Sequence, residues 1–149
     1  MSGDSEPDGF AAAAAAGVHR LSIPTPFAVG RVNCYLIDDD PLTLVDTGPN
    51  SGTSLDELTR RVADLGRTLE EIELIVITHE HIDHLGLVGL VASRSGAEVA
   101  AIDHAVPIVE RFATEMQAND DFAGATMLRH GIPEDVVRAL QSVSRAFRA

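Results

Sequence analysis

The seven residues Thr-His-Glu-His-Ile-Asp-His at positions 78–84 could bind a metal ion. Imidazole nitrogen and carboxylate oxygen are the usual non-sulfur ligands of zinc, and they also suit iron or manganese. His79 and His81 are two residues apart, so in an extended segment their side chains project to the same side. Asp83 and His84 can turn back to that point as a helix begins. A lone histidine on an apolar face is usually a hydrogen-bonded core residue, but this spacing favours a metal site.

The segments on either side of the cluster would place it at the end of a strand. Residues 72 and 74–77 are apolar and rich in β-branched side chains, which is typical of a buried strand. Residues 85–93 have helical character. Because α/β proteins carry their chemistry where the carboxyl end of a strand enters a helix, we expect the candidate site there.

Strands and helices are mixed in the first two-thirds of the chain, and the last third is helical. Further strands are expected at residues 18–23, 31–37, 42–45 and 98–102, and helices at residues 106–118, 122–130 and 133–147. Ser54 with Glu57 forms a capping-box pattern that predicts the start of another helix, which Gly66 ends. Thr68 with Glu71 repeats the pattern before the strand at 72–77.

The net charge of −12, from 23 acidic and 11 basic residues, argues against nucleic acid or an anionic membrane as the main partner. The only cysteine, Cys34, excludes a disulfide within the chain and a cysteine-based zinc site, and we expect it to be a small buried hydrophobe.

No apolar run reaches the length of a membrane helix. Acidic residues precede the short run at residues 10–16, which is the wrong sign for a signal peptide, so we expect a cytoplasmic protein. The sequence predicts a disordered tail at residues 1–16, a domain at residues 17–103 and a helical extension at residues 104–149.

Three segments of the chain, in this order, resemble the N-terminal half of the metallo-β-lactamase superfamily. Residues 32–37 look like the family's early strand, residues 44–48 like its strand with an Asp-Thr-Gly turn, and residues 78–84 match its H-x-H-x-D-H motif at every defined position. Asp-Thr-Gly alone would be weak, whereas H-x-H-x-D-H is specific. The likeness spans about residues 18–102, and it implies an α/β fold that forms the first half of an αββα sandwich.

The resemblance also implies roles for the cluster. His79 and His81 would bind one metal ion, and Asp83 and His84 a second one, with zinc as the expected ion. In this family the ions hold a hydroxide that attacks the substrate, because a metal lowers the pKa of bound water from about 15.7 to about 7. Asp83 would orient this nucleophile and accept its proton.

Asp46, in the Asp-Thr-Gly turn, would lie behind the histidines and fix the tautomer and direction of one ring. The alternative for Asp46 is a turn acid that bonds nearby backbone amides.

The chain departs from the family after residue 102, where its remaining histidines are His104 and His130. The family completes its site with two further histidines and a bridging carboxylate from its second half. Neither His104 nor His130 stands in a Gly-x-x-His-Thr-x-Gly context, and we expect them to cap a turn and end a helix, respectively. We therefore expect a truncated member in which four ligands are shared between two metal ions.

Two classes of function remain open at this point. The first is a metal-dependent hydrolase of a small-molecule ester, thioester, lactone, lactam or phosphoester, with up to two zinc ions and with iron or manganese as alternatives. The second is a catalytically incomplete fragment or a non-enzymatic module that binds metal or a partner through an exposed sheet. A second copy of the chain or a complementing C-terminal half is the partner expected in that case.

Overall fold

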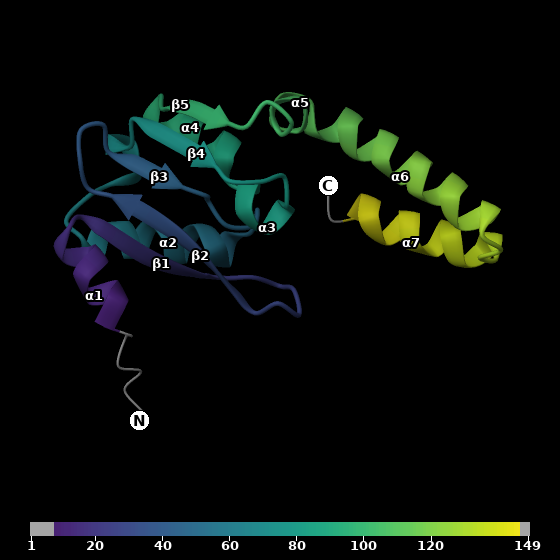
Figure 1. Cartoon of the computed structure of the whole chain (residues 1–149), viewed down its shortest axis with the longest axis horizontal. Coiled ribbons are helices and arrows are strands. Elements are labelled where there is room, and N and C mark those ends of the chain that lie inside the picture. Colours follow the sequence, from purple (N-terminus) through teal and green to yellow (C-terminus); the bar gives the residue numbers. More distant parts are fainter. Residues whose placement is uncertain (1–7, 147–149) are drawn as a thin grey trace. The chain divides into compact units, whose positions relative to one another are not determined.

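The computed structural model describes residues 8–146, which form an α/β fold (Figure 1). The chain divides into two compact units, one that ends at Ile102 and one that begins at Asp103. The sequence predicted a boundary one residue later. No helix within residues 8–146 is long and apolar enough to cross a membrane.

The first unit is built on a five-stranded sheet with the strand order β1-β2-β3-β4-β5. The strands are β1 (Val18–Pro24), β2 (Arg31–Ile37), β3 (Thr43–Val45), β4 (Leu74–Ile77) and β5 (Glu98–Ala101). β1, β2 and β3 pair antiparallel, whereas β3, β4 and β5 pair parallel. Parallel strands end at the same edge of a sheet, so the residues that follow β3 and β4 are brought together.

One face of this sheet is buried and the other is only partly covered. Leu36, Leu44 and Ile75 face each other in register on neighbouring strands, and each is fully buried. The helices α2 (Gly52–Asp64) and α4 (Val88–Ser95) lie behind the sheet in Figure 1, and Val62 and Val91 of these helices are fully buried. Burial of apolar side chains between a sheet and its helices is the main stabilising term of such a layered fold.

The start of α2 differs from the predicted one. Ser51, not Ser54, is the N-cap, and its hydroxyl accepts the Ser54 N–H at 3.1 Å. The hydroxyl of Ser54 donates instead to the carbonyl of Pro24 at 3.0 Å, which ties the helix to β1. Ser51 and Ser54 could each cap the helix N-terminus, and the packing of α2 on β1 decides which of the two is the N-cap.

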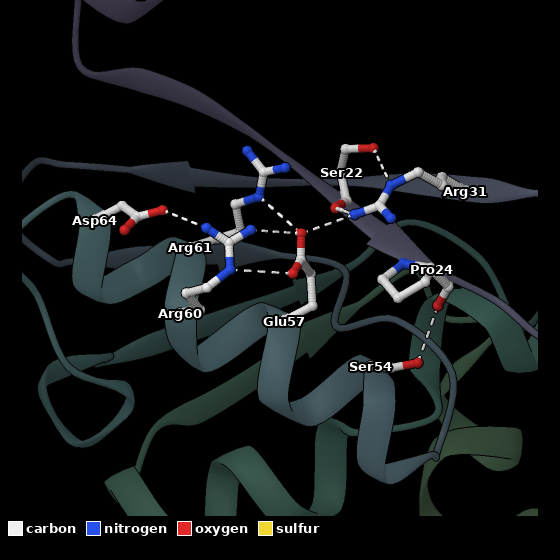
Figure 2. A network of polar contacts seen from close by, with 8 residues as sticks. All are labelled: Ser22, Pro24, Arg31, Ser54, Glu57, Arg60, Arg61 and Asp64. Carbon is white, nitrogen blue, oxygen red and sulfur yellow. Dashed lines mark hydrogen bonds and ion pairs between the residues drawn. The ribbon is translucent and has the colours of Figure 1, made fainter. Parts of the chain in front are cut away.

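Glu57, predicted to complete a capping box, binds arginines instead (Figure 2). Its Oε1 lies 2.8 Å from Arg31 on β2, 2.8 Å from Arg60 and 3.0 Å from Arg61. Hydrogen bonds from Arg60 and Arg61 lower the pKa of the Glu57 carboxyl to about 2. One carboxylate therefore links the exposed side of α2 to the sheet.

The capping pattern at Thr68 is present in the structure, where the Thr68 N–H donates to Glu71 at 2.7 Å ahead of β4. It begins a short 3-10 helix, η1 (Leu69–Glu71), rather than an α-helix.

Residues 8–15, predicted to be part of a disordered tail, form the helix α1 (Asp8–Ala15). Alanine has the highest intrinsic helix propensity, and the guanidinium of Arg20 on β1 stacks over the Phe10 ring at 4.4 Å. The rest of the predicted tail, residues 1–7, lies outside the described residues.

The helix predicted at residues 85–93 is split in two. α3 (Ile82–Leu85) is a single turn that begins inside the histidine cluster, and α4 follows it after Gly86 and Leu87. A Cβ atom on Gly86 would lie 2.7 Å from the Ile82 carbonyl oxygen and 2.8 Å from the backbone of Pro49. The close approach of the 49–50 loop to α3 therefore requires glycine here.

The second unit consists of α5 (Val106–Glu110), α6 (Phe112–Arg129) and α7 (Glu134–Ala146). α6 is one continuous helix where the sequence predicted a break between residues 118 and 122. α7 packs against it: the amide of Gln141 donates to the Asp120 carbonyl at 3.1 Å, and the hydroxyl of Ser144 donates to the Asp120 carboxylate at 2.9 Å. These contacts stabilise the middle of α6, where residues 119–121 are Asn, Asp and Asp, which have low helix propensity.

Candidate metal centre

Three histidine rings lie together at the carboxyl end of β4. The centroids of His79 and His81 are 4.6 Å apart, and those of His79 and His84 are 4.2 Å apart. The backbone N–H of His84 donates to the His81 carbonyl at 2.9 Å, which closes the first turn of α3. This turn brings Asp83 back beside the rings, with its Oδ2 3.9 Å from His84 Nε2. The structure thus gathers the four side chains that the sequence singled out.

Asp46, which follows the last residue of β3, forms hydrogen bonds with two residues of this segment, Thr78 and His84. It is almost fully buried and has a positive φ of 58°, a backbone conformation that aspartate tolerates better than most residues. Its Oδ1 accepts the backbone N–H of Thr78 at 2.9 Å. Its Oδ2 lies 2.8 Å from the Thr78 hydroxyl and 2.8 Å from His84 Nδ1. The carboxylate therefore binds a histidine ring, and the backbone amide that it also binds is that of Thr78, 32 positions away, rather than an amide of its own turn.

Thr47 and Gly48, the other two residues of the Asp-Thr-Gly turn, hold the backbone of α3. The Thr47 N–H donates to the His84 carbonyl at 2.7 Å. The Leu87 N–H, two residues after the end of α3, donates to the Thr47 hydroxyl at 3.1 Å and to the Gly48 carbonyl at 3.2 Å. Two segments almost forty residues apart are therefore joined by backbone and side-chain hydrogen bonds.

The donor atoms of Asp46, His79 and His84 all lie within 4.8 Å of one another. Two imidazoles and a carboxylate suit zinc or a similar divalent ion, so the donor set fits the predicted cofactor. This group contains two of the four predicted ligands, His79 and His84, together with Asp46, which was predicted to lie behind the histidines. His81, which is exposed, and Asp83 lie next to this group.

Asp46 is better suited to support the ligands than to be one. Both of its oxygens already accept hydrogen bonds from Thr78, and one of them also accepts from His84. A carboxylate that holds the far nitrogen of a histidine ring fixes the tautomer in which the other nitrogen can bind a metal.

The two histidines after residue 102 are exposed and belong to the second unit. His130 follows the last residue of α6, as predicted for a residue that ends a helix, and His104 lies in the turn before α5.

An open pocket of about 220 Å³ adjoins the cluster within the first unit. Phe27 and Val29 of the loop between β1 and β2 form its apolar wall, and His81, Ile82 and Asp83 form the rest. Sequence reasoning missed this loop, because the two apolar residues carry no signal until the strands bring them next to α3.

Cys34 is buried in β2, as predicted for a small hydrophobe. Burial raises the pKa of its thiol far above the usual range, and the negative charge of Asp46 adds to this effect.

Sequence reasoning also missed the supporting role of Thr78, which binds the Asp46 carboxylate. Its only signal is its position directly before the first histidine.

The helix-backed mixed sheet with a histidine-aspartate cluster at the ends of its parallel strands is the architecture of an α/β protein with a candidate metal site. The family model described as the metallo-beta-lactamase superfamily matches residues 28–144, and the chain belongs to this superfamily. The predicted family and fold class are confirmed.

The chain is similar to several known proteins. It is 33% identical over 129 residues to the probable metallo-hydrolase YqjP of Bacillus subtilis, a match that covers 85% of the chain and 39% of the relative. It superimposes on the crystal structure of the metallo-beta-lactamase family protein TTHA1429 from Thermus thermophilus with a TM-score of 0.70 and 30% identity, covering 83% and 41% of the two chains.

A shorter match, 36% identical over 67 residues, links the chain to exodeoxyribonuclease WalJ of Streptococcus pneumoniae and covers 45% of the chain and 23% of the relative. The chain thus spans about two fifths of the length of the first two relatives and a smaller share of the third.

Proposed function

We propose that the chain carries the metal-binding part of a hydrolase that acts on a small-molecule ester, thioester, lactone, lactam or phosphoester. The observation that carries the proposal is the cluster itself. The ring of His79 contacts those of His81 and His84 at the end of β4, Asp83 lies 3.9 Å from His84, and Asp46 binds His84 from the end of β3.

In this proposal His79, His81, Asp83 and His84 hold one or two divalent ions, with zinc as the favoured ion. A divalent ion bound there would supply Lewis-acid chemistry, which polarises the substrate and activates water at neutral pH. Iron or manganese would suit the same nitrogen and oxygen donors.

The chain's own residues would prepare the site for that chemistry. Asp46 holds the His84 ring by its Nδ1 atom, so that the ring presents Nε2 to the cluster. Asp83, whose side chain is 17% exposed, would orient the attacking water and accept its proton. Phe27 and Val29 would bind an apolar part of the substrate next to Asp83, because they line the same pocket.

A small-molecule substrate is favoured over nucleic acid by charge. The net charge of −12 repels a phosphate backbone, and residues 78–84 contain no basic side chain other than histidine. Because one relative is named an exodeoxyribonuclease, DNA belongs among the substrates tested.

Metal analysis combined with a substrate panel tests the proposal. Purified protein, loaded with zinc and dialysed, should retain at least one zinc ion per chain and lose most of it in His81→Ala. His104→Ala, which changes an exposed histidine of the second unit, is the matched control and should leave the zinc content unchanged. The loaded protein should hydrolyse one of the chromogenic esters, lactams or phosphoesters in the panel.

The remaining alternative is a metal-binding or interaction module without catalysis. Zinc binding that depends on His81 without turnover of any substrate would favour that alternative. A zinc content far below one ion per chain in the wild type would contradict the metal-site proposal altogether.

A further inference from the structure

We propose that Thr78 is a positioning residue that transmits the effect of the Asp46 carboxylate to His79. One buried carboxylate would then set the tautomers of two histidines, directly for His84 and through the Thr78 hydroxyl for His79. The inference rests on the proposed function only in so far as these rings are metal ligands.

Thr78 lies between the two groups that it would connect. Its hydroxyl oxygen is 2.8 Å from Asp46 Oδ2 and 2.9 Å from His79 Nδ1. Its backbone N–H donates to the other oxygen of the same carboxylate at 2.9 Å. The two hydrogen bonds to Asp46 fix Thr78 relative to the end of β3, so the hydroxyl has little freedom to turn away.

The directions of these hydrogen bonds follow from which of the three groups carries a proton that it can donate. A carboxylate can only accept, so the single proton of the Thr78 hydroxyl must point to Asp46. The hydroxyl oxygen can then only accept from His79, which requires that His79 carry its proton on Nδ1. The lone pair of the neutral ring is left on Nε2.

His84 reaches the same state without an intermediary. Its Nδ1 lies 2.8 Å from Asp46 Oδ2, so it must carry a proton to donate to the carboxylate. The two neighbouring rings therefore both present Nε2 as the unprotonated nitrogen. Histidine ligands in metal sites usually donate their other ring nitrogen to a carboxylate or carbonyl, and loss of such a partner costs about 10- to 100-fold in metal affinity.

A purely structural role for Thr78 would rest on its backbone N–H and its methyl group, and the hydroxyl would be incidental. Thr78→Val separates the two roles, because valine keeps the backbone donor and the shape but lacks the hydroxyl. Thr78→Ser restores the hydroxyl. Thr59→Val on α2 is the matched control, since the Thr59 hydroxyl is exposed and bonds the Leu55 carbonyl of its own helix.

The first readout is nitrogen NMR of the histidine rings in metal-free protein at about pH 8, above the ordinary histidine pKa of about 6.5. We expect the Nδ1–H tautomer at His79 and His84 in the wild type. Thr78→Val should give mixed tautomers at His79 alone, and Thr78→Ser should restore the wild-type spectrum. The second readout is zinc affinity, which should fall about 10- to 100-fold in Thr78→Val and stay unchanged in Thr59→Val.

An Nε2–H tautomer at His79 in the wild type would overturn the inference, and this measurement needs no variant to fold. Unchanged His79 tautomers and zinc affinity in Thr78→Val would overturn it as well. If the wild type shows the expected tautomers but binds no zinc, the proposed function fails while the hydrogen-bond relay stands.

Discussion

Asp46 Oδ2 lies 2.8 Å from His84 Nδ1, which joins the end of β3 to the single turn of α3. The two residues are 38 positions apart in the chain, and the contact exists because β3 and β4 are parallel neighbours. It makes a buried carboxylate the common support of the backbone turn and of the candidate ligands.

Asp46→Asn should destabilise the protein by about 1–3 kcal/mol, because an amide has one acceptor oxygen for donors that now bind two. Asparagine also tolerates a positive φ, so the backbone at this position is not additionally strained. Urea denaturation measures the loss. Asp46→Ala should cost more, since it also removes every hydrogen bond to the side chain.

The same variant distinguishes a supporting carboxylate from a ligand. If Asp46 only supports the rings, Asp46→Asn should bind the same number of zinc ions with lower affinity. Loss of a whole zinc ion at saturating zinc would show instead that Asp46 is itself a ligand.

Gly86→Ala should destabilise the first unit by about 1–3 kcal/mol or more, because the added Cβ would collide with backbone atoms at Ile82 and Pro49 that cannot rotate away. Gly89→Ala is the matched control. Gly89 lies in α4 with nothing within 4 Å of an added Cβ, and alanine is the better helix former. Thermal unfolding should therefore show a lower Tm for Gly86→Ala and an equal or higher Tm for Gly89→Ala.

The ion pairs of Glu57 with Arg31, Arg60 and Arg61 should make the free energy of unfolding depend on pH in the acid range. The pKa of Glu57 is about 2 in the folded protein, below the value of about 4.3 expected for an unfolded chain. Its stabilising contribution is therefore fully present above about pH 4.3 and is lost as the pH falls towards 2. Glu57→Gln should be less stable than the wild type at neutral pH, and the difference should shrink over this interval.

Denaturation of both proteins between pH 7 and pH 2 checks that expectation. Asp56→Asn, which changes the neighbouring exposed acid on α2, should show a much smaller difference at every pH. A gap between wild type and Glu57→Gln that stays constant down to the lowest pH would show that the arginine contacts of Figure 2 do not stabilise the fold.

Cys34 should be inert towards thiol reagents in the folded protein. Its burial keeps reagents out, and its raised pKa keeps the thiol protonated at neutral pH, whereas the thiolate is the reactive form. We expect one thiol per chain to react with Ellman's reagent in urea and almost none in buffer. Rapid reaction in buffer would mean that the sheet opens far more often than its packing implies.

The sequence by itself determined the strands and the identity of the cluster. β2 begins and ends where predicted, because alternating apolar residues between turn residues have one favourable conformation on a sheet. Residues 78–84 predict a metal site through residue type and spacing alone, which are properties of neighbours along the chain.

Tertiary structure decided the hydrogen-bond and ion-pair partners of the polar side chains. Ser54, predicted as a helix cap, bonds Pro24, and Glu57, predicted to complete that cap, binds arginines. Asp46 and Thr78 form a relay that no local pattern contains. Hydrogen-bonding groups such as these have several acceptable partners of similar energy, so the choice is made only when packing of the apolar faces brings distant segments together.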